Sequence, residues 1–156
     1  MINFSNLLNA DCVFLDLAGE SRQVVLRQLS EVLGDAAGID ARTVLEAVIE
    51  RERLGSTAIG DGVSIPHIRC EGLSEPIGAF ARLATPVDFD ALDGRHCDLV
   101  FMLLAPECEG SAHLRALAQI SRGFRQGEFR EAVRAAKTND EIVSLLGVDE
   151  EQGQAA

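Results

Sequence analysis

Residues 51 to 67 read Arg-Glu-Arg-Leu-Gly-Ser-Thr-Ala-Ile-Gly-Asp-Gly-Val-Ser-Ile-Pro-His. The stretch begins as the end of a helical pattern, contains three glycines between residues 55 and 62, and ends in a histidine directly after Pro66. Three glycines so close together predict a loop with unusual dihedral angles or a close approach to a ligand. Proline favours extended backbone in the residue before it, so we expect His67 to stand at a strand end beside this loop.

Strand and helix patterns alternate on the N-terminal side of this stretch. The apolar run at 12–17 predicts a strand, and helical periodicity from about Ser21 continues until Gly38. Asp40 is a candidate N-cap for a second helix, and Gly55 lies beyond the end of that helix. Arginines then occupy its last turn, where positive charge favours the helix dipole.

Strands dominate the middle of the chain and helices the C-terminal part. Apolar and β-branched runs predict strands at 63–65, 77–83, 87–89 and 99–104. The run at 99–104 is continuously apolar, which is typical of a strand buried on both faces. Helices are predicted from a cap at Ser111, at 130–136, and after a capping box at 138–141.

This order predicts one α/β (mixed α+β) domain over residues 1–148, with a mixed central β-sheet flanked by helices. The remaining residues, 149–156, form an acidic and polar tail without core-forming side chains. We expect that tail to be disordered.

Charge and hydropathy restrict the partners that the chain can have. Fourteen basic against 25 acidic residues give a net charge of −11, which disfavours binding to nucleic acid and to anionic lipid. No apolar run of 18 residues occurs, and the N-terminus lacks the pattern of a signal peptide. The sequence therefore predicts a cytoplasmic protein without direct membrane insertion, whose partners are other proteins.

The cysteines do not resemble a disulfide framework or a metal site. Cys12, Cys70, Cys97 and Cys108 contain no C-x-x-C pair, so we expect reduced, mostly buried thiols. His67 and Cys70 have H-x-x-C spacing, and a zinc site completed by the pair at 96–97 is an alternative. It is disfavoured because those two residues are adjacent and no second spaced pair completes the tetrahedron. We expect no metal and no cofactor.

Histidine can act as a nitrogen nucleophile near neutral pH, and the chain has three histidines. His67 is the candidate nucleophile, although a structural histidine satisfied by hydrogen bonds is the alternative. His113 falls in the first turn of the helix that Ser111 is predicted to cap, where the dipole keeps an imidazole neutral and favours a bound anion. His96 stands in a polar turn and is expected to be a surface residue.

Three further residues of the opening stretch can contact phosphate. Arg51 carries a guanidinium that can form paired hydrogen bonds with phosphate oxygens. Ser56 and Thr57 carry hydroxyls that can donate to the same oxygens. Together with His67 they supply the parts of a phosphoryl site without a metal, and no Gly-rich nucleotide-binding motif accompanies them.

Several motifs in this order resemble one known family. They are the stretch ending in His67, Asp93-Gly94, the apolar run 99–104 with Pro106, and Ala112-His113-Leu114. The chain is similar to the enzyme IIA domain of the fructose/mannitol type of the bacterial phosphotransferase system. The resemblance spans most of the chain and implies the enzyme IIA type 2 fold.

The resemblance also implies roles for individual residues. His67 matches the histidine that accepts a phosphoryl group on Nε2 from the carrier protein HPr or its nitrogen-branch relative NPr, while its Nδ1–H bonds a backbone carbonyl. His113 matches the second active-site histidine, and Arg51 matches the arginine that neutralises charge. The family usually has glycine after the nucleophile, where this chain has Ile68. If that position required positive φ, isoleucine would be strained there.

Three functions follow from the resemblance and remain open. The chain is most similar to the free-standing, nitrogen-related enzyme IIA, which implies a regulatory phosphocarrier. The alternatives are an enzyme IIA component of a fructose- or mannitol-type sugar transporter, and a regulatory docking module that does not use phosphorylation. Ile68 is the feature that keeps the docking module open.

Overall fold

The computed structural model describes residues 2–107 and 110–148. The strands are β1 (Val13–Leu17), β2 (Ala58–Gly60), β3 (Val63–Ser64), β4 (His67–Cys70), β5 (Ile77–Val87) and β6 (Cys97–Pro106). A short 3-10 helix, η1 (Ala10–Cys12), precedes them. The α-helices are α1 (Arg22–Ala37), α2 (Ala41–Leu54), α3 (Gly110–Phe124), α4 (Gly127–Ala135) and α5 (Asn139–Leu145).

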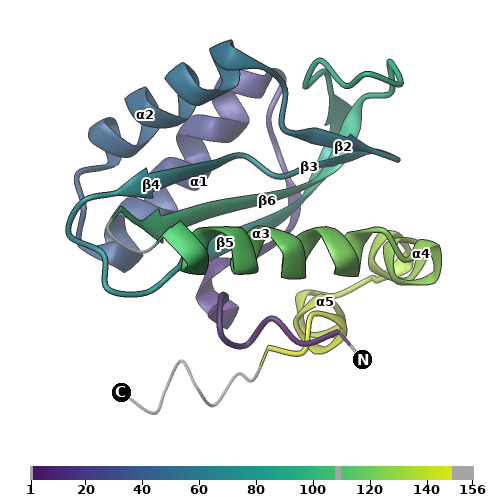
Figure 1. Cartoon of the computed structure of the whole chain (residues 1–156). Helices are drawn as coiled ribbons and strands as arrows, with labels where there is room; N and C mark the ends of the chain where they lie inside the picture. Colours follow the sequence, from purple (N-terminus) through teal and green to yellow (C-terminus); the bar gives the residue numbers. More distant parts are fainter. Residues whose placement is uncertain (1, 108–109, 149–156) are drawn as a thin grey trace.

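One mixed sheet of six strands lies between two layers of helices (Figure 1). The strand order is β1-β5-β6-β3-β2, and β4 also pairs with β6. Helices α1 and α2 cover one face, while α3, α4 and α5 lie on the other. This arrangement confirms the predicted α/β fold with a mixed central sheet.

Strand β6 is the centre of the sheet. It pairs antiparallel with β5 along one edge and parallel with both β3 and β4 along the other. Every residue from Leu99 to Pro106 is buried, which confirms the prediction that this apolar run is covered on both faces. β3 and β4 follow one another along the same edge of β6 and are separated only by Ile65 and Pro66.

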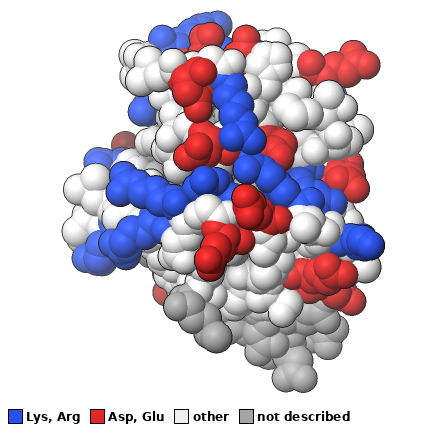
Figure 2. Space-filling model, turned by 90° about the vertical axis from the view of Figure 1, so that its right-hand side faces the viewer, with Lys and Arg blue, Asp and Glu red and all other residues white. Residues whose placement is uncertain are grey.

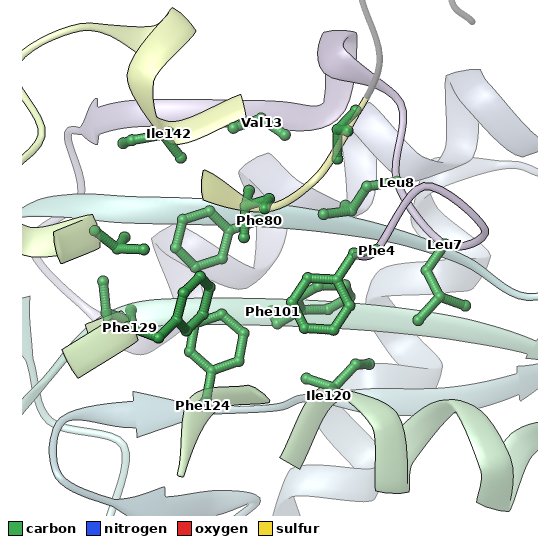
Figure 3. Close-up of a cluster of buried hydrophobic side chains, with 14 of the residues drawn as sticks. Phe4, Leu7, Leu8, Val13, Phe80, Phe101, Ile120, Phe124, Phe129 and Ile142 are labelled. Atoms are coloured by element: carbon green, nitrogen blue, oxygen red, sulfur yellow. The ribbon is translucent and has the colours of Figure 1, made fainter. Parts of the chain in front are cut away.

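Each face of the sheet has its own hydrophobic core. Under α3, α4 and α5 the core is rich in phenylalanine, and Figure 3 shows these rings grouped between the sheet and the helices. Phe124 stacks on Phe80 at 5.6 Å between ring centroids and meets Phe129 edge-on at 5.1 Å. Under α1 and α2 the core is built from aliphatic side chains, Phe89 and three cysteines. Sheet and helices are thus held together by apolar burial on both sides.

The N-terminal segment closes the phenylalanine-rich core. Phe4 is buried, and its N–H donates to the carbonyl of Leu146 at 2.8 Å. The carbonyl of Leu7 accepts from Gly78 N–H of β5 at 2.7 Å. These bonds tie the first residues both to the sheet and to the turn that follows α5.

Several predicted element boundaries need correction. The strand predicted at 77–83 continues to Val87 as β5, and residues 88 and 89 of the strand predicted at 87–89 are not in a strand. The residues expected to form only a loop and a strand end contain β2 and β4. α3 begins at Gly110, so Ser111 lies inside its first turn and is not the N-cap. Asp40 stands at the N-cap of α2 but makes no capping bond with a backbone N–H. Its carboxylate accepts instead from the Thr43 hydroxyl at 3.2 Å.

Other predicted details are confirmed. The helix predicted from about Ser21 is α1, and the capping box predicted at 138–141 forms at α5, where Thr138 accepts from Glu141 N–H. Three cysteines, Cys12, Cys70 and Cys97, are buried free thiols. Cys108 and the predicted tail, 149–156, lie outside the described residues.

Residues 2–107 and 110–148 contain neither a membrane-spanning helix nor a cluster of metal-binding side chains. None of the helices there has the length and apolar character needed to cross a membrane. In the same residues, His, Cys, Asp and Glu side chains form no group of three or more that could hold a metal ion.

Candidate functional site

His67 is the first residue of β4 and is half-buried at the sheet surface. β4 is placed by parallel pairing with β6, in which His67 lies opposite Leu103. The carbonyl of Pro66 accepts from Leu103 N–H at 2.8 Å, so the proline that lacks a donor still joins the ladder through its oxygen. The backbone that carries the histidine is therefore fixed by the buried centre of the sheet.

A backbone carbonyl determines which nitrogen of His67 is free. Nδ1 of His67 lies 2.7 Å from the carbonyl oxygen of Ile65. A carbonyl only accepts hydrogen bonds, so Nδ1 carries the proton and Nε2 of the neutral ring carries a lone pair. Nε2 is thus the ring nitrogen with a free lone pair, and it is the atom to which the resemblance gives the role of phosphoryl acceptor.

The surroundings keep His67 neutral. Burial lowers the pKa of His67 below its ordinary value, and the positive charge of Arg51 lowers it further, while the hydrogen bond to Ile65 acts in the opposite direction. Because only the neutral imidazole has a lone pair on Nε2, a lowered pKa leaves more of the protein in the nucleophilic form at neutral pH.

His113 comes from the first turn of α3 and faces His67 across 46 residues of sequence. The two rings lie 5.3 Å apart between centroids and are tilted by 48°. Burial lowers the pKa of His113, and the neighbouring charges of His67, Arg69 and Arg51 lower it further. The lowered pKa is in the direction of the neutral His113 that the sequence predicts, and its largest cause is burial.

Arg69 joins the site without having been assigned a role from the sequence. Its Nε donates to Nδ1 of His113 at 3.0 Å. The basis for this contact is the twofold alternation of a strand, which places Arg69 on the same face of β4 as His67. Ile68 and Cys70 point to the opposite face and are buried. The alternation could have been recognised only if β4 had been predicted as a strand.

Ile68 is not strained by its replacement of the usual glycine. The non-glycine residues with positive φ are Asp16, Asp61 and Asp90, so Ile68 has the ordinary φ of a strand. It pairs with Leu104 of β6 and packs into the core under α2. The expected strain is absent, and isoleucine adds an apolar anchor to the strand that carries the nucleophile.

Arg51 lies in the last turn of α2, close enough to lower the pKa of both histidines. Its Nη1 donates to the carbonyl of Gly55 at 3.1 Å, which holds the side chain against the end of its own helix. None of the ion pairs among the described residues involves Arg51 or Arg69. Two guanidinium groups beside two neutral imidazoles form a site that favours an anion.

The hydroxyls of Ser56 and Thr57 are engaged within the fold. Ser56 Oγ donates to the carbonyl of Phe89 at 2.5 Å, and Thr57 Oγ1 donates to the buried carboxylate of Glu52 at 2.7 Å. Each hydroxyl has one proton, so donation to a phosphoryl oxygen would require breaking the bond described here. Their predicted role as phosphate donors therefore remains a prediction, and their observed role is to fix the loop after α2.

Comparison with protein families and curated proteins gives one consistent result. The family model described as "Phosphoenolpyruvate-dependent sugar phosphotransferase system, EIIA 2" matches residues 6–147. A nitrogen regulatory protein of Pseudomonas aeruginosa is 37% identical over 155 residues, which is 99% of this chain and 100% of that protein. A fructose-specific EIIA component of Haloferax volcanii is 31% identical over 92% of this chain and 94% of its own length.

Solved structures agree with this assignment. The crystal structure of nitrogen regulatory protein IIA-Ntr from Neisseria meningitidis superposes with a TM-score of 0.86 at 33% identity, covering 91% of this chain and 97% of that one. The mannitol IIA of Escherichia coli superposes with a TM-score of 0.75 at 20% identity, over 88% of this chain and 97% of its own, and shows the shared fold.

Proposed function

Since the chain belongs to the type 2 enzyme IIA family of the phosphoenolpyruvate-dependent sugar phosphotransferase system, we propose that it is a phosphocarrier that accepts a phosphoryl group on His67. The proposal rests on the hydrogen bonding of one ring nitrogen in each histidine, Nε2 of His67 and Nε2 of His113. Nε2 of His67 has a free lone pair because Nδ1 is held by Ile65, and Nε2 of His113 is buried without a hydrogen-bond partner among residues 2–107 and 110–148. A nucleophile and a hydrogen-bond donor thus occur side by side.

Phosphoryl transfer from a phosphohistidine donor fits this geometry. Nε2 of His67 attacks the phosphorus, the bond between phosphorus and the donor's imidazole breaks, and its electron pair returns to the donor nitrogen. Nδ1–H of His67 stays on the Ile65 carbonyl, which stabilises the positive charge that develops on the ring. One P–N bond replaces another, so the step needs positioning and charge stabilisation more than covalent chemistry from other residues.

Three groups can hold the oxygens of the transferred phosphoryl group. Arg51 and Arg69 supply positive charge that no carboxylate neutralises within the described part of the chain. His113 supplies an N–H donor. Guanidinium and imidazole donors match the dispersed charge of the phosphoryl oxygens.

We assign the chain to the nitrogen-related regulatory branch of the system. Identity of 37–38% with two nitrogen regulatory proteins over nearly their full lengths supports this branch. The fructose-specific relative of comparable coverage supports the second candidate, an enzyme IIA component of a sugar transporter. The two candidates share the chemistry at His67 and differ in the donor and in the protein that responds to phosphorylation.

The donor of the phosphoryl group is an HPr-like or NPr-like carrier in this proposal. A net charge of −11 favours a carrier whose docking surface is basic or apolar, and it predicts faster association at low salt. If the carrier were chosen by charge alone, raising ionic strength would slow transfer from HPr and NPr alike. A preference for one carrier at fixed ionic strength would indicate specific contacts.

The test is phosphorylation of the purified protein. Incubation with phosphoenolpyruvate, enzyme I and either HPr or NPr should add one phosphoryl group in intact mass, and the His67→Ala variant should gain none. A phosphoryl group retained on that variant would place the acceptor elsewhere. No gain with either carrier would support the docking module that works without phosphorylation. A faster reaction with NPr would support the nitrogen branch, and a faster reaction with HPr the sugar branch.

A further inference from the structure

We propose that Arg69 is a positioning residue that selects the tautomer of His113 in which Nε2 carries the proton and can donate to the phosphoryl group on His67. The inference rests on the proposed function for the identity of the acceptor, but the tautomer itself can be tested on the unphosphorylated protein. It assigns a function to Arg69, the last residue of the Pro-His-x-Arg segment that also contains His67.

The donor and acceptor chemistry of the contact determines the tautomer. A guanidinium is always protonated and can only donate. Nε of Arg69 lies 3.0 Å from Nδ1 of His113, so Nδ1 must offer a lone pair. A neutral imidazole carries one proton, and that proton must therefore be on Nε2. Protonating Nδ1 would turn two donors toward each other.

The other nitrogen of His113 is the one available to the site. Nε2 is buried and has no hydrogen-bond partner among the described residues. A buried polar atom without a partner is uncommon and often marks a functional position. His67 lies beside it, with 5.3 Å between ring centroids. A donor fixed at this position can bond an oxygen of a group attached to Nε2 of His67.

The sheet gives Arg69 the rigidity that the role requires. The residues before and after Arg69 are both buried. Ile68 is 7% exposed and packs in the core, and Cys70 is 9% exposed. β4 pairs with β6 at all four of its residues, with Arg69 opposite Ala105. Two buried anchors and a continuous ladder hold the backbone of β4, so the guanidinium starts from a fixed point and bridges to α3. Glycine at position 68 would remove one of these anchors.

The charge of Arg69 acts in the same direction as its hydrogen bond. A positive charge next to His113 disfavours the imidazolium form, and the pKa of His113 is lowered accordingly. Loss of Arg69 would therefore have two separable consequences, release of the tautomer and a weaker preference for the neutral ring. Lysine at position 69 would retain the charge with a differently placed donor.

The first measurement is the tautomer of His113 in the unphosphorylated protein by long-range 1H–15N correlation NMR. The wild type should show Nε2 protonated and Nδ1 unprotonated, and Arg69→Ala should show a mixture of tautomers. Arg115→Ala is the matched control. Arg115 is exposed on α3, the helix that carries His113, and its loss changes the net charge by the same amount as the loss of Arg69. Protonated Nδ1 in the wild type, or an unchanged tautomer in Arg69→Ala, would overturn the proposal.

The second measurement is the rate of phosphorylation of His67. Arg69→Ala should slow it by about tenfold, as for loss of one hydrogen bond to a charged group, while Arg115→Ala leaves it unchanged. Arg69→Lys should recover part of the rate. Full recovery by lysine together with a mixed tautomer would show that charge alone acts, which contradicts the proposal. If wild type gains no phosphoryl group, the proposed function fails, and the NMR result still decides the tautomer.

Discussion

The two ends of β6 use arginine in opposite ways. At the Asp98 end, Arg134 of α4 forms two hydrogen bonds with the Asp98 carboxylate at 2.8 and 2.9 Å, and Arg130 pairs with Asp61 at 3.6 Å. At the other end, Arg51 and Arg69 stand beside the histidines and enter none of the ion pairs described above. At the Asp98 end, carboxylates neutralise the arginines and join α4 to the sheet. At the histidine end, the positive charge remains available to an anion.

The surface of the α4 end shows this neutralisation directly. Figure 2 views the molecule from the side on which α4 lies in Figure 1, and there lysine and arginine form a connected band with aspartate and glutamate above and below it. Close approach of the backbone contributes as well. Gly62 has a φ of +79°, and a Cβ added there would lie 2.6 Å from Nη2 of Arg134 and 2.9 Å from Oδ1 of Asp98, so a larger residue would displace this pair. Arg134 is therefore held by a carboxylate and a backbone carbonyl, whereas Arg51 and Arg69 enter none of the ion pairs among the described residues.

Substitution of an unpaired arginine should have the largest effect. Arg51→Ala is expected to slow phosphorylation of His67 by about 100-fold, because one fixed charge at the transferring group is lost. The free energy of unfolding should change by less than about 1 kcal/mol, since only the bond to Gly55 disappears. Transfer from phosphorylated HPr or NPr, measured by rapid quench, checks the rate.

Arg53→Ala is the control for Arg51→Ala. Arg53 is exposed at the same helix end and pairs with Glu50, so its loss removes equal charge without touching the histidines. Equal slowing in the two variants would mean that net charge near α2, and not the position of Arg51, determines the rate.

The paired end should give the reverse result. Arg134→Ala is expected to lower the free energy of unfolding by about 1–3 kcal/mol, because it leaves the partly buried Asp98 carboxylate without its partner. Phosphorylation of His67 under conditions where the variant is folded should proceed at the wild-type rate. Denaturant unfolding measures the first quantity. A slow transfer rate in folded Arg134→Ala would show that the two ends of β6 are coupled.

Substitution of Ser56 tests whether the loop after α2 contributes to stability or to phosphoryl transfer. Ser56→Ala should lower the free energy of unfolding by about 1 kcal/mol through loss of the bond to the Phe89 carbonyl. The rate of phosphorylation should change by less than about twofold, because that proton is used inside the fold. A tenfold slower rate with unchanged stability would restore the interpretation from the sequence that Ser56 donates to the phosphoryl group.

The pH dependence of transfer should be the smallest effect. The pKa of His67 lies below its ordinary 6.5, so lowering the pH from 8 to 6.5 should cost less than about half of the rate. Near pH 6.5 the unfolded chain binds more protons at this position than the folded chain. The contribution of His67 to the free energy of unfolding is therefore fully present above pH 6.5, and it falls as the pH decreases toward the lower pKa of His67 in the folded state. NMR titration of His67 checks the direction, and a midpoint above 6.5 would contradict it.

The strongest sequence patterns predicted the core of the fold. The apolar run at 99–104 became the central strand, and the periodic helix from about Ser21 and the helix after the capping box at Thr138 formed where expected. The short strands β2 and β4 were missed because three or four residues give too little alternation to distinguish a strand from a loop. They form because β3 and β6 offer unpaired edges, which is a property of the folded sheet.

Site residues that neighbouring residues in the sequence identify were predicted. Contacts that depend on how distant segments fold together were missed. His67, His113 and Arg51 were named from local context and resemblance, and the structure brings them together. The partner of Arg69 is 44 residues away, so no local pattern could identify it. The internal bonds of Ser56 and Thr57 were likewise invisible, because the Phe89 carbonyl and the buried Glu52 carboxylate become partners only after folding.

The bond between Phe4 and Leu146 has a consequence for synthesis of the protein on the ribosome. Phe4 is translated before every helix and strand of the described fold, yet the carbonyl that its N–H requires belongs to Leu146, directly after α5. The phenylalanine-rich core also contains Phe124 and Phe129, which follow Phe4 by more than a hundred residues. The segment around Phe4 therefore stays exposed during synthesis until α5 has been translated, and exposed apolar segments of this kind favour aggregation.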